Sequence, residues 1–174
     1  MAKTVLTRPD ASEYAEYYER YVGKITGTDI IEILKQQHAE IQALIASVPA
    51  EKENFRYAEG KWSIRELVGH VLDGERVFAY RALVFARNDQ TPLPGFEQDF
   101  WVTHSNHGNV PLAELAAELS SVRQSTIDLF RHLAPDAWTN RGVANNKEMS
   151  VRAAAYVIAG HAAHHLDVLK SRYL

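Results

Sequence analysis

Three histidines gather in one short and otherwise apolar stretch near the end of the sequence, GHAAHHL at residues 160–166. On a helix, residues four apart lie one turn apart on the same face, so the rings of His161 and His165 can converge on one metal ion. His164 is three residues from His161 and could replace His165 in the pair, although we favour the spacing of four. An imidazole without a partner in so apolar a helix carries a desolvation cost, which a metal removes by taking the lone pair.

A third candidate ligand is His70, which lies in another largely apolar segment. Bundle cores build metal sites from side chains on facing helices. With His161 and His165, it would give three nitrogens and leave positions open for water or substrate, which is the ligand count of a catalytic zinc site. The competing interpretation is that all three are core histidines whose ring nitrogens bond to protein groups, and the residues alone leave both open.

Other polar side chains are candidates for proton transfer. The HExxH motif of zinc peptidases is absent, because alanines follow the first histidine of the pair. Asp73 lies one turn after His70 on the same face, where it could orient that ring or accept a proton. Asp99, His104 and His107 lie in a long connection that could close over the site, although each also fits a solvated loop. We take Asp73, Asp99 and His104 as the catalytic candidates.

Four further residues could be structural, and one of them, Arg81, could also bind substrate. Arg81 lies three turns from the His70 position on nearly the same helical face, where it could bind a substrate carboxylate or pair with a glutamate. Trp62 is expected to pack at the start of that helix. His38 is expected in the core, and His132 at the negative end of a helix.

Helical spacing of apolar residues predicts four long helices, over about residues 29–47, 63–86, 112–134 and 150–173. Ser63 and Glu66 form a capping box at the second, and Asp29 and Ser150 are plausible N-caps of the first and last. No segment alternates with period two, so little or no sheet is expected. The polar stretch 139–148, with its Asn-Asn pair, is typical of a turn.

The connection over residues 87–111 is long enough to cross the molecule, and it contains prolines, glycines, aromatics and acids. Long loops inside compact domains are often functional. Four long helices with one such crossover predict an all-α four-helix bundle over residues 29–174. Residues 1–28 are predicted to be an N-terminal extension packing on the bundle, in which tyrosines from Tyr14 to Tyr21 follow the stripe of one short helix.

Composition excludes several classes of function. The chain has 174 residues and a net charge of −3 without a basic block, so the electrostatic footprint of a nucleic-acid binder is missing. It has no cysteine, which excludes a disulfide, a thiol nucleophile and a thiolate ligand from the protein itself. The first residues lack the apolar core of a signal peptide, and no run has the length of a membrane span, so we expect a cytoplasmic protein without a membrane partner.

Several of these segments resemble the DinB-like (YfiT-like) metalloprotein superfamily. The resemblance runs from about Tyr14 to the C-terminus. It is carried by KWSIRELVGH (61–70), ERVFAYRA (75–82), PLPGF (92–96) and GHAAHHL (160–166). It implies a four-helix bundle with a histidine-only metal triad, whose ligand positions fall on His70, His161 and His165.

The resemblance also implies a choice of reactions, because the family includes proteins called hydrolases and thiol-dependent enzymes similar to maleylpyruvate isomerase and bacillithiol transferase. Three neutral imidazoles leave one divalent ion, zinc or nickel, its full charge, which favours bound hydroxide or thiolate. We therefore expect a small-molecule substrate and either hydrolysis or transfer of a low-molecular-weight thiol, and on resemblance a homodimer. A non-catalytic binding or sensing module and a purely structural metal are the alternatives, since no dedicated base is evident.

Overall fold

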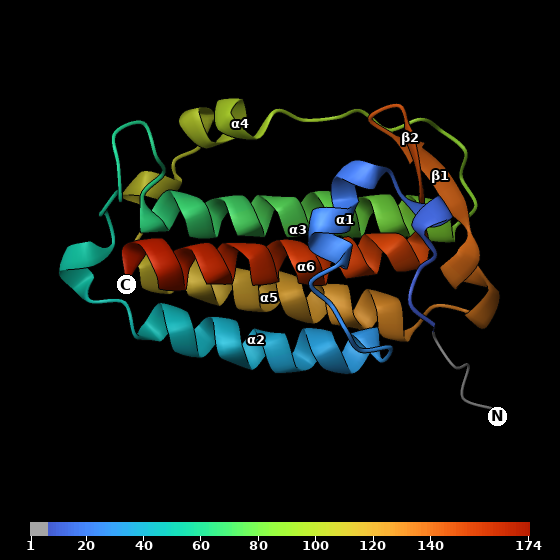
Figure 1. The fold of residues 1–174 in the computed structure, drawn as a ribbon, viewed down its shortest axis with the longest axis horizontal. Coiled ribbons are helices and arrows are strands. Elements are labelled where there is room, and N and C mark those ends of the chain that lie inside the picture. Colours follow the sequence, from blue (N-terminus) through green and yellow to red (C-terminus); the bar gives the residue numbers. More distant parts are fainter. Residues whose placement is uncertain (1–6) are drawn as a thin grey trace.

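The computed structural model describes residues 7–174, and four long helices form its main body. These are α2 (Ile30–Ala46), α3 (Ile64–Ala86), α5 (Leu112–Arg131) and α6 (Val151–Val168). Figure 1 shows that α3 and α5 run in one direction while α2 and α6 run in the other. The connection from α3 to α5 therefore returns along the length of the bundle. The predicted all-α four-helix bundle with a long crossover loop is confirmed.

The helices begin where the sequence places capping side chains. Asp29 accepts a hydrogen bond from the backbone of α2, and Ser150 Oγ accepts one from Ala153 N at 3.0 Å at the start of α6. Ser63 and Glu66 form the reciprocal capping box of α3. Each cap satisfies backbone N–H groups that have no partner inside the helix. Beyond α6 the chain continues as a π-helical turn, Leu169–Tyr173.

The crossover contains regular structure that the sequence analysis treated only as a connection. A short helix, α4 (Gln98–His104), is capped by Glu97, whose Oε2 accepts a hydrogen bond from Phe100 N at 2.7 Å. A 3-10 turn follows at His107–Asn109. In Figure 1, α4 lies alongside α3. Seven residues are too few to reveal a helical period in the sequence.

A two-stranded hairpin precedes α6. Strands β1 (Arg141–Ala144) and β2 (Lys147–Ser150) pair antiparallel across Asn145 and Asn146, whose φ angles are 52° and 58°. Asparagine tolerates this left-handed backbone, which two-residue hairpin turns require. The turn was predicted and the strands were not, because four residues cannot show a clear alternation. Leu93 N donates to Val143 O at 2.9 Å and so attaches the crossover to the hairpin.

The N-terminal segment forms three short pieces where one helix was predicted. They are 3-10 turns at Ala11–Glu13 and Glu16–Tyr18 and the single α-turn α1 (Glu19–Val22). The segment approaches α6 closely at Gly160, where an added Cβ would lie 2.0 Å from the carbonyl oxygen of Tyr21. A larger residue there would push the segment off the bundle.

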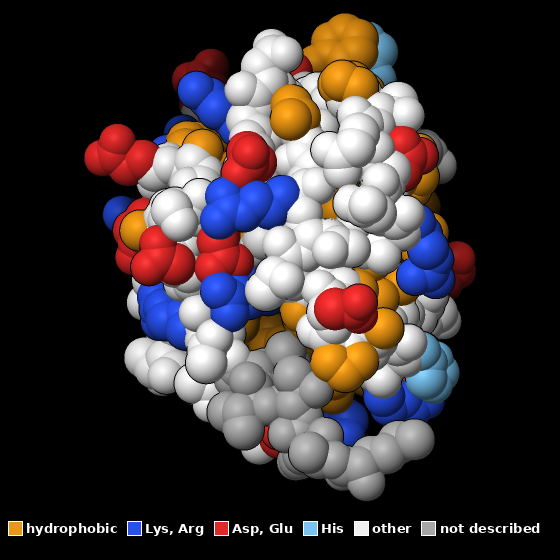
Figure 2. All heavy atoms as spheres, turned by 90° about the vertical axis from the view of Figure 1, so that its right-hand side faces the viewer, with side chains coloured by type: hydrophobic (Ala, Val, Ile, Leu, Met, Phe, Trp, Pro, Cys, Tyr) orange, Lys and Arg blue, Asp and Glu red, His pale blue; other side chains and the backbone are white. Residues whose placement is uncertain are grey.

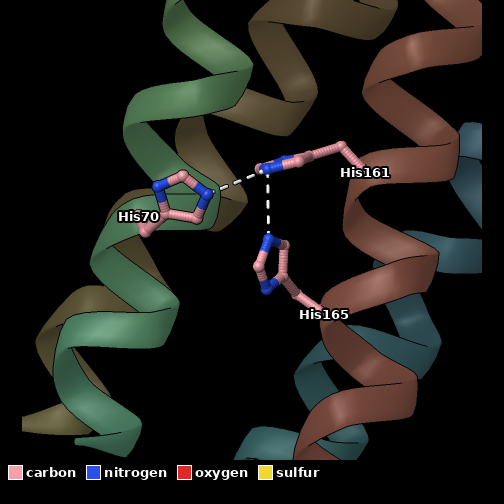
Figure 3. Close-up of side chains that lie close together, drawn as sticks. All are labelled: His70, His161 and His165. Atoms are coloured by element: carbon pink, nitrogen blue, oxygen red, sulfur yellow. Dashed lines mark hydrogen bonds between the residues drawn. The ribbon is translucent and has the colours of Figure 1, made fainter. Parts of the chain in front are cut away.

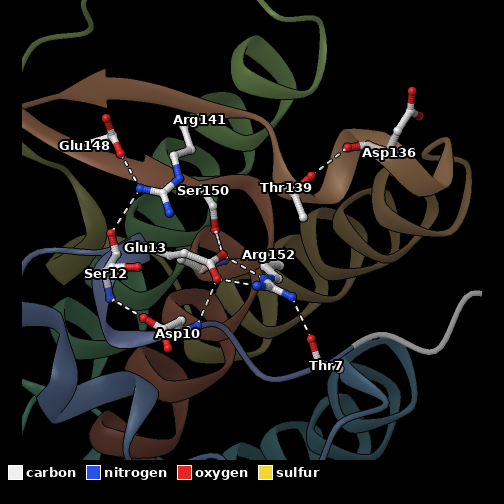
Figure 4. Close-up of polar contacts among 11 residues, drawn as sticks. Thr7, Asp10, Ser12, Glu13, Asp136, Thr139, Arg141, Glu148, Ser150 and Arg152 are labelled. Atoms are coloured by element: carbon white, nitrogen blue, oxygen red, sulfur yellow. Dashed lines mark hydrogen bonds and ion pairs between the residues drawn. The ribbon is translucent and has the colours of Figure 1, made fainter.

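A buried carboxylate fixes the same segment to the start of α6 (Figure 4). Glu13 accepts hydrogen bonds from Ser150 Oγ and Arg152 Nε, both at 2.7 Å. Burial alone would raise the pKa of Glu13, but hydrogen bonds from Arg152, the Asp10 backbone and Ser150 outweigh it and hold that pKa below its usual value. The carboxylate therefore stays charged and paired.

The surface carries charges of both signs. Figure 2 views the end of the molecule with the hairpin, where acidic and basic side chains are interspersed. Among residues 7–174, no helix combines the length and the apolar character that crossing a bilayer requires.

One polar network joins all four long helices inside the bundle. The fully buried guanidinium of Arg123 donates to both oxygens of Glu75 at 2.8 Å and to Gln37 Oε1 at 3.0 Å. It also donates to the carbonyl of Leu34 at 3.2 Å, and Gln37 Nε2 donates to the carbonyl of Ala159 at 2.8 Å. The network fixes α2, α3, α5 and α6 in register, because each bond needs its own geometry.

Replacing Arg123 alone should lower the stability much more than replacing both partners of the Arg123–Glu75 ion pair. We expect Arg123→Leu to lower the free energy of unfolding by about 3–5 kcal/mol, because Glu75 is left buried and unpaired. Adding Glu75→Leu should restore much of the loss. Denaturant titrations of the single and double variants measure both effects. A single variant as stable as the wild type would contradict this account of the network.

Candidate metal centre

Helices α3 and α6 bring the three predicted ligands together in the interior of the bundle (Figure 3). His161 Nε2 lies 3.0 Å from His70 Nε2 and 3.2 Å from His165 Nε2. One ring nitrogen from each residue falls within 4.8 Å of the others. The side chains are largely buried, with residue exposures of 4%, 6% and 9% for His70, His161 and His165.

The donor set fits a divalent ion better than a set of hydrogen bonds. His161 Nε2 faces two other ring nitrogens, yet a neutral imidazole nitrogen offers either one proton or one lone pair. It therefore cannot bond well to both. Zinc with bonds of about 2.0–2.1 Å and tetrahedral angles needs ligand nitrogens about 3.3–3.4 Å apart, close to the spacings from His161.

Burial keeps the three rings uncharged at neutral pH. It lowers the pKa of His70 to about 4 and that of His161 to about 3, and it holds the pKa of His165 well below its usual value. The neighbouring histidines lower these values further, because a second charge nearby would repel the first. Each ring thus keeps a lone pair available to a cation.

Neighbouring residues fix the planes of the rings. The Tyr21 ring meets His161 edge-on at 5.3 Å between centroids, and Trp62 lies 4.7 Å from His70. Trp62 packs at the helix start as predicted and also borders the triad. Gly74 leaves room for His161, since an added Cβ would lie 2.8 Å from its Cε1. Gly74 was not predicted as part of the site, although a glycine inside a buried helix one turn after a candidate ligand was a usable signal.

Two large hollows border the triad, each at different histidines. The smaller, of about 360 Å³, is lined by His70 and His161 together with tyrosines of the N-terminal segment. The larger, of about 790 Å³, is lined by His165 and lies among the loop before α3, α4 and the end of α6. His164 lines the larger hollow, but it lies outside the group of converging nitrogens.

The predicted catalytic residues occupy different surroundings. Asp99 is exposed and lines the larger hollow. His104 is exposed, stacks on Phe100 at 4.0 Å between centroids, and has its Nδ1 2.8 Å from the carbonyl of the same residue. His104 is not among the residues lining either hollow. The structure therefore brings Asp99, and not His104, to the rim of a hollow beside the triad.

The carboxylate of Asp73 contacts residues other than the His70 ring, which it could have oriented. Its carboxylate lies 3.8 Å from Arg76 and 3.9 Å from His107 Nδ1, and no hydrogen bond joins it to His70. Burial raises the pKa of Asp73, partly opposed by these two neighbours. Since Gly69 has no side chain, the ring of His107 can lie against α3 beside this carboxylate. A proton-transfer role for Asp73 would have to involve the His107 side of α3.

The two remaining histidines lie away from the triad. His38 is half-buried with its Nε2 2.8 Å from Ser120 Oγ, so it lies at the edge of the core and not inside it as predicted. His132 is exposed at the C-cap of α5, as predicted.

The chain is a four-helix bundle with a long connection between α3 and α5 and three converging histidines on α3 and α6. These features define a class of helical proteins whose candidate metal ligands lie between two facing helices. A family model described as the DinB superfamily matches residues 33–169. This chain belongs to the DinB superfamily.

One similar protein sequence and two similar solved structures are consistent with this family assignment. A protein of Oceanobacillus iheyensis named "putative metal-dependent hydrolase" is 30% identical over 152 residues, which cover 84% of this chain and 87% of the relative. Bacillus subtilis YfiT, described as "a probable metal-dependent hydrolase with an unusual four-helix bundle topology", aligns with a TM-score of 0.74 and 15% identity over 95% of this chain and 90% of its own. The mycothiol-dependent maleylpyruvate isomerase aligns with a TM-score of 0.67 and 11% identity, over 84% of this chain and 62% of its own. Both structures support the fold.

The space at Gly74 gives a test of how the triad is held. Gly74→Ala should displace the His161 ring and cost about 1–3 kcal/mol of stability, because the added methyl overlaps that ring. In a His161→Ala background the same change should be neutral or stabilising by up to about 1 kcal/mol, as alanine favours a helix. Denaturant titration and imidazole ¹⁵N spectra measure both effects. Equal costs in the two backgrounds would contradict the contact.

Proposed function

We propose that this protein is a metal-dependent enzyme that holds one divalent ion, zinc or nickel, on His70, His161 and His165 and acts on a small molecule. The observation that carries the proposal is the convergence of three buried, uncharged imidazoles on one point that borders two hollows. Three protein nitrogens leave positions for water or substrate, as in catalytic sites. The names of the Oceanobacillus and Bacillus relatives support metal dependence.

The bound ion would lower the pKa of water or a thiol so that it becomes a nucleophile near neutral pH. The imidazoles add no negative charge, so the cation keeps its full attraction for an anionic nucleophile. The low exposure of the three histidines, 4–9%, limits the access of bulk water and strengthens these charge interactions. Asp99 is the candidate acceptor of a proton, since it lines the hollow that His165 borders. Roles for Asp73 and His104 stay predictions.

Hydrolysis of an ester, amide or similar small electrophile is the first candidate reaction, supported by the hydrolase names of the relatives. Transfer of a low-molecular-weight thiol is the second. It is favoured by the presence of hollows on two sides of the triad, because two substrates need separate space. The chain has no cysteine, so the thiol would come from a cosubstrate. The mycothiol dependence named for one structural neighbour is compatible with this second reaction.

Metal analysis tests the ligand set. Protein purified without metal-affinity resin should carry about one equivalent of zinc or nickel, and His161→Ala should carry almost none, because two imidazoles bind a divalent ion weakly. His164→Ala is the matched control, since it removes a neighbouring histidine that lies outside the converging group. Equal metal loss in the two variants, or a wild type that binds no divalent metal, would overturn the proposal.

Activity assays separate an enzyme from a binding module. We expect turnover of either 4-nitrophenyl esters or an electrophile such as chlorodinitrobenzene with mycothiol, bacillithiol or glutathione. His70→Ala should lower that rate about 100-fold or more while the helical circular dichroism is kept. A metal-loaded wild type without activity in either panel would favour the sensing or binding alternative. A large fall in melting temperature on chelation would favour a structural metal.

A further inference from the structure

One arginine is buried in the bundle without a carboxylate partner. Arg81 is only 2% exposed, and its Nη2 donates to the carbonyl of Pro94 at 3.0 Å. No ion pair within 4 Å joins it to an acid among residues 7–174. A guanidinium has five N–H donors, and a buried cation is costly unless it is paired. The other buried arginine, Arg123, has both oxygens of Glu75.

The side chain of Arg81 faces the hollow that reaches the triad. It lines the space of about 360 Å³ together with His70 and His161. Residues 70, 74, 78 and 81 follow one stripe of α3, and at 1.5 Å per residue the Cα atoms of His70 and Arg81 are about 16 Å apart along the axis. Arginine side chains on a helix lean toward its N-terminus, which brings the guanidinium closer to the histidine.

The walls of this hollow are aromatic on several sides. The Arg81 guanidinium lies 4.9 Å from the centroid of the Phe78 ring and 5.9 Å from that of Phe96. Three tyrosines of the N-terminal segment complete the lining: Tyr17, Tyr18 and Tyr21. Such contacts hold the guanidinium in place without neutralising it.

The charges in the hollow favour an anionic ligand. Lys147 is a second cation in the lining. Glu97 is the single acid among the described residues that line the hollow, and it is exposed and engaged as the N-cap of α4. We propose that Arg81 binds the carboxylate of a small substrate with an apolar or aromatic body, whose reactive group then lies at the histidine triad. This inference rests on the proposed function and adds the chemical class of its substrate.

The arrangement gives the substrate an orientation. A carboxylate on Arg81 accepts two parallel hydrogen bonds, which fix its plane as well as its position. The aromatic walls then hold the body of the molecule between the guanidinium and the imidazoles. A substrate of this class needs an anionic end and a reactive bond separated by a short apolar segment.

Binding of simple carboxylates tests the inference. Benzoate and phenylacetate should bind the metal-loaded wild type in NMR titrations, and neutral benzamide should bind at least about tenfold more weakly. Arg81→Gln should weaken carboxylate binding about tenfold or more, because a charged bidentate contact is lost. Lys147→Gln makes the same change of charge at an exposed residue of the same hollow, and it should weaken binding clearly less than Arg81→Gln does.

A metal-free variant separates this inference from the proposed function. His161→Ala should keep carboxylate binding that depends on Arg81, even if it binds no metal. Carboxylate binding that is lost in His161→Ala and kept in Arg81→Gln would show that the ion alone binds the anion, and would overturn the inference. Failure of both carboxylates to bind the wild type would overturn it as well.

A second variant guards against a structural effect of Arg81→Gln, because the guanidinium also holds the crossover through Pro94. Arg81→Lys keeps the positive charge and a donor for that carbonyl, but it loses the two parallel N–H donors that a guanidinium offers to a carboxylate. We expect it to melt near the wild type and to bind carboxylates with an intermediate affinity. If Arg81→Lys binds them as well as the wild type, and Arg81→Gln melts much lower, Arg81 only holds the loop and the inference fails.

Discussion

Three imidazole rings packed against one another inside a bundle cannot satisfy their facing nitrogens with their own protons. His161 Nε2 lies within 3.2 Å of two others, so one of these contacts always lacks a suitable donor and acceptor. Protonation does not relieve the conflict, since burial lowers the pKa of these histidines. A shared cation satisfies all three lone pairs at once. This constraint connects the fold to the proposed chemistry.

Much of the scaffold fixes the relative position of α3 and α6. The buried network around Arg123 joins both to α2 and α5, and the carboxylate of Glu13 fixes the N-terminal segment against the start of α6. Glycines allow the closest approaches, Gly160 toward the backbone of Tyr21 and Gly74 toward a ligand ring. The same packing leaves hollows on two sides of the triad, one of them lined by the buried Arg81.

The long helices and the pairing of His161 with His165 could be predicted from sequence, because helical periodicity and a spacing of four residues are local signals. His70 was a candidate from its apolar surroundings, and the family resemblance assigned it to the triad. Short elements could not, since α4 and the hairpin strands are too brief to show a period. The pairing of Arg123 with Glu75 and the facing of Asp73 toward His107 depend on which helices become neighbours, and no local pattern encodes that. The division at residue 28 and the homodimer stay predictions.

X-ray absorption spectroscopy at the metal edge of protein purified without metal-affinity resin identifies the atoms bound to the ion. Three imidazole nitrogens should surround it, at about 2.0–2.1 Å if the metal is zinc, with one further light or sulfur ligand. His161→Ala should abolish this signal and His164→Ala should preserve it. A first shell of oxygen ligands without imidazole scattering would show that the three histidines do not hold the ion.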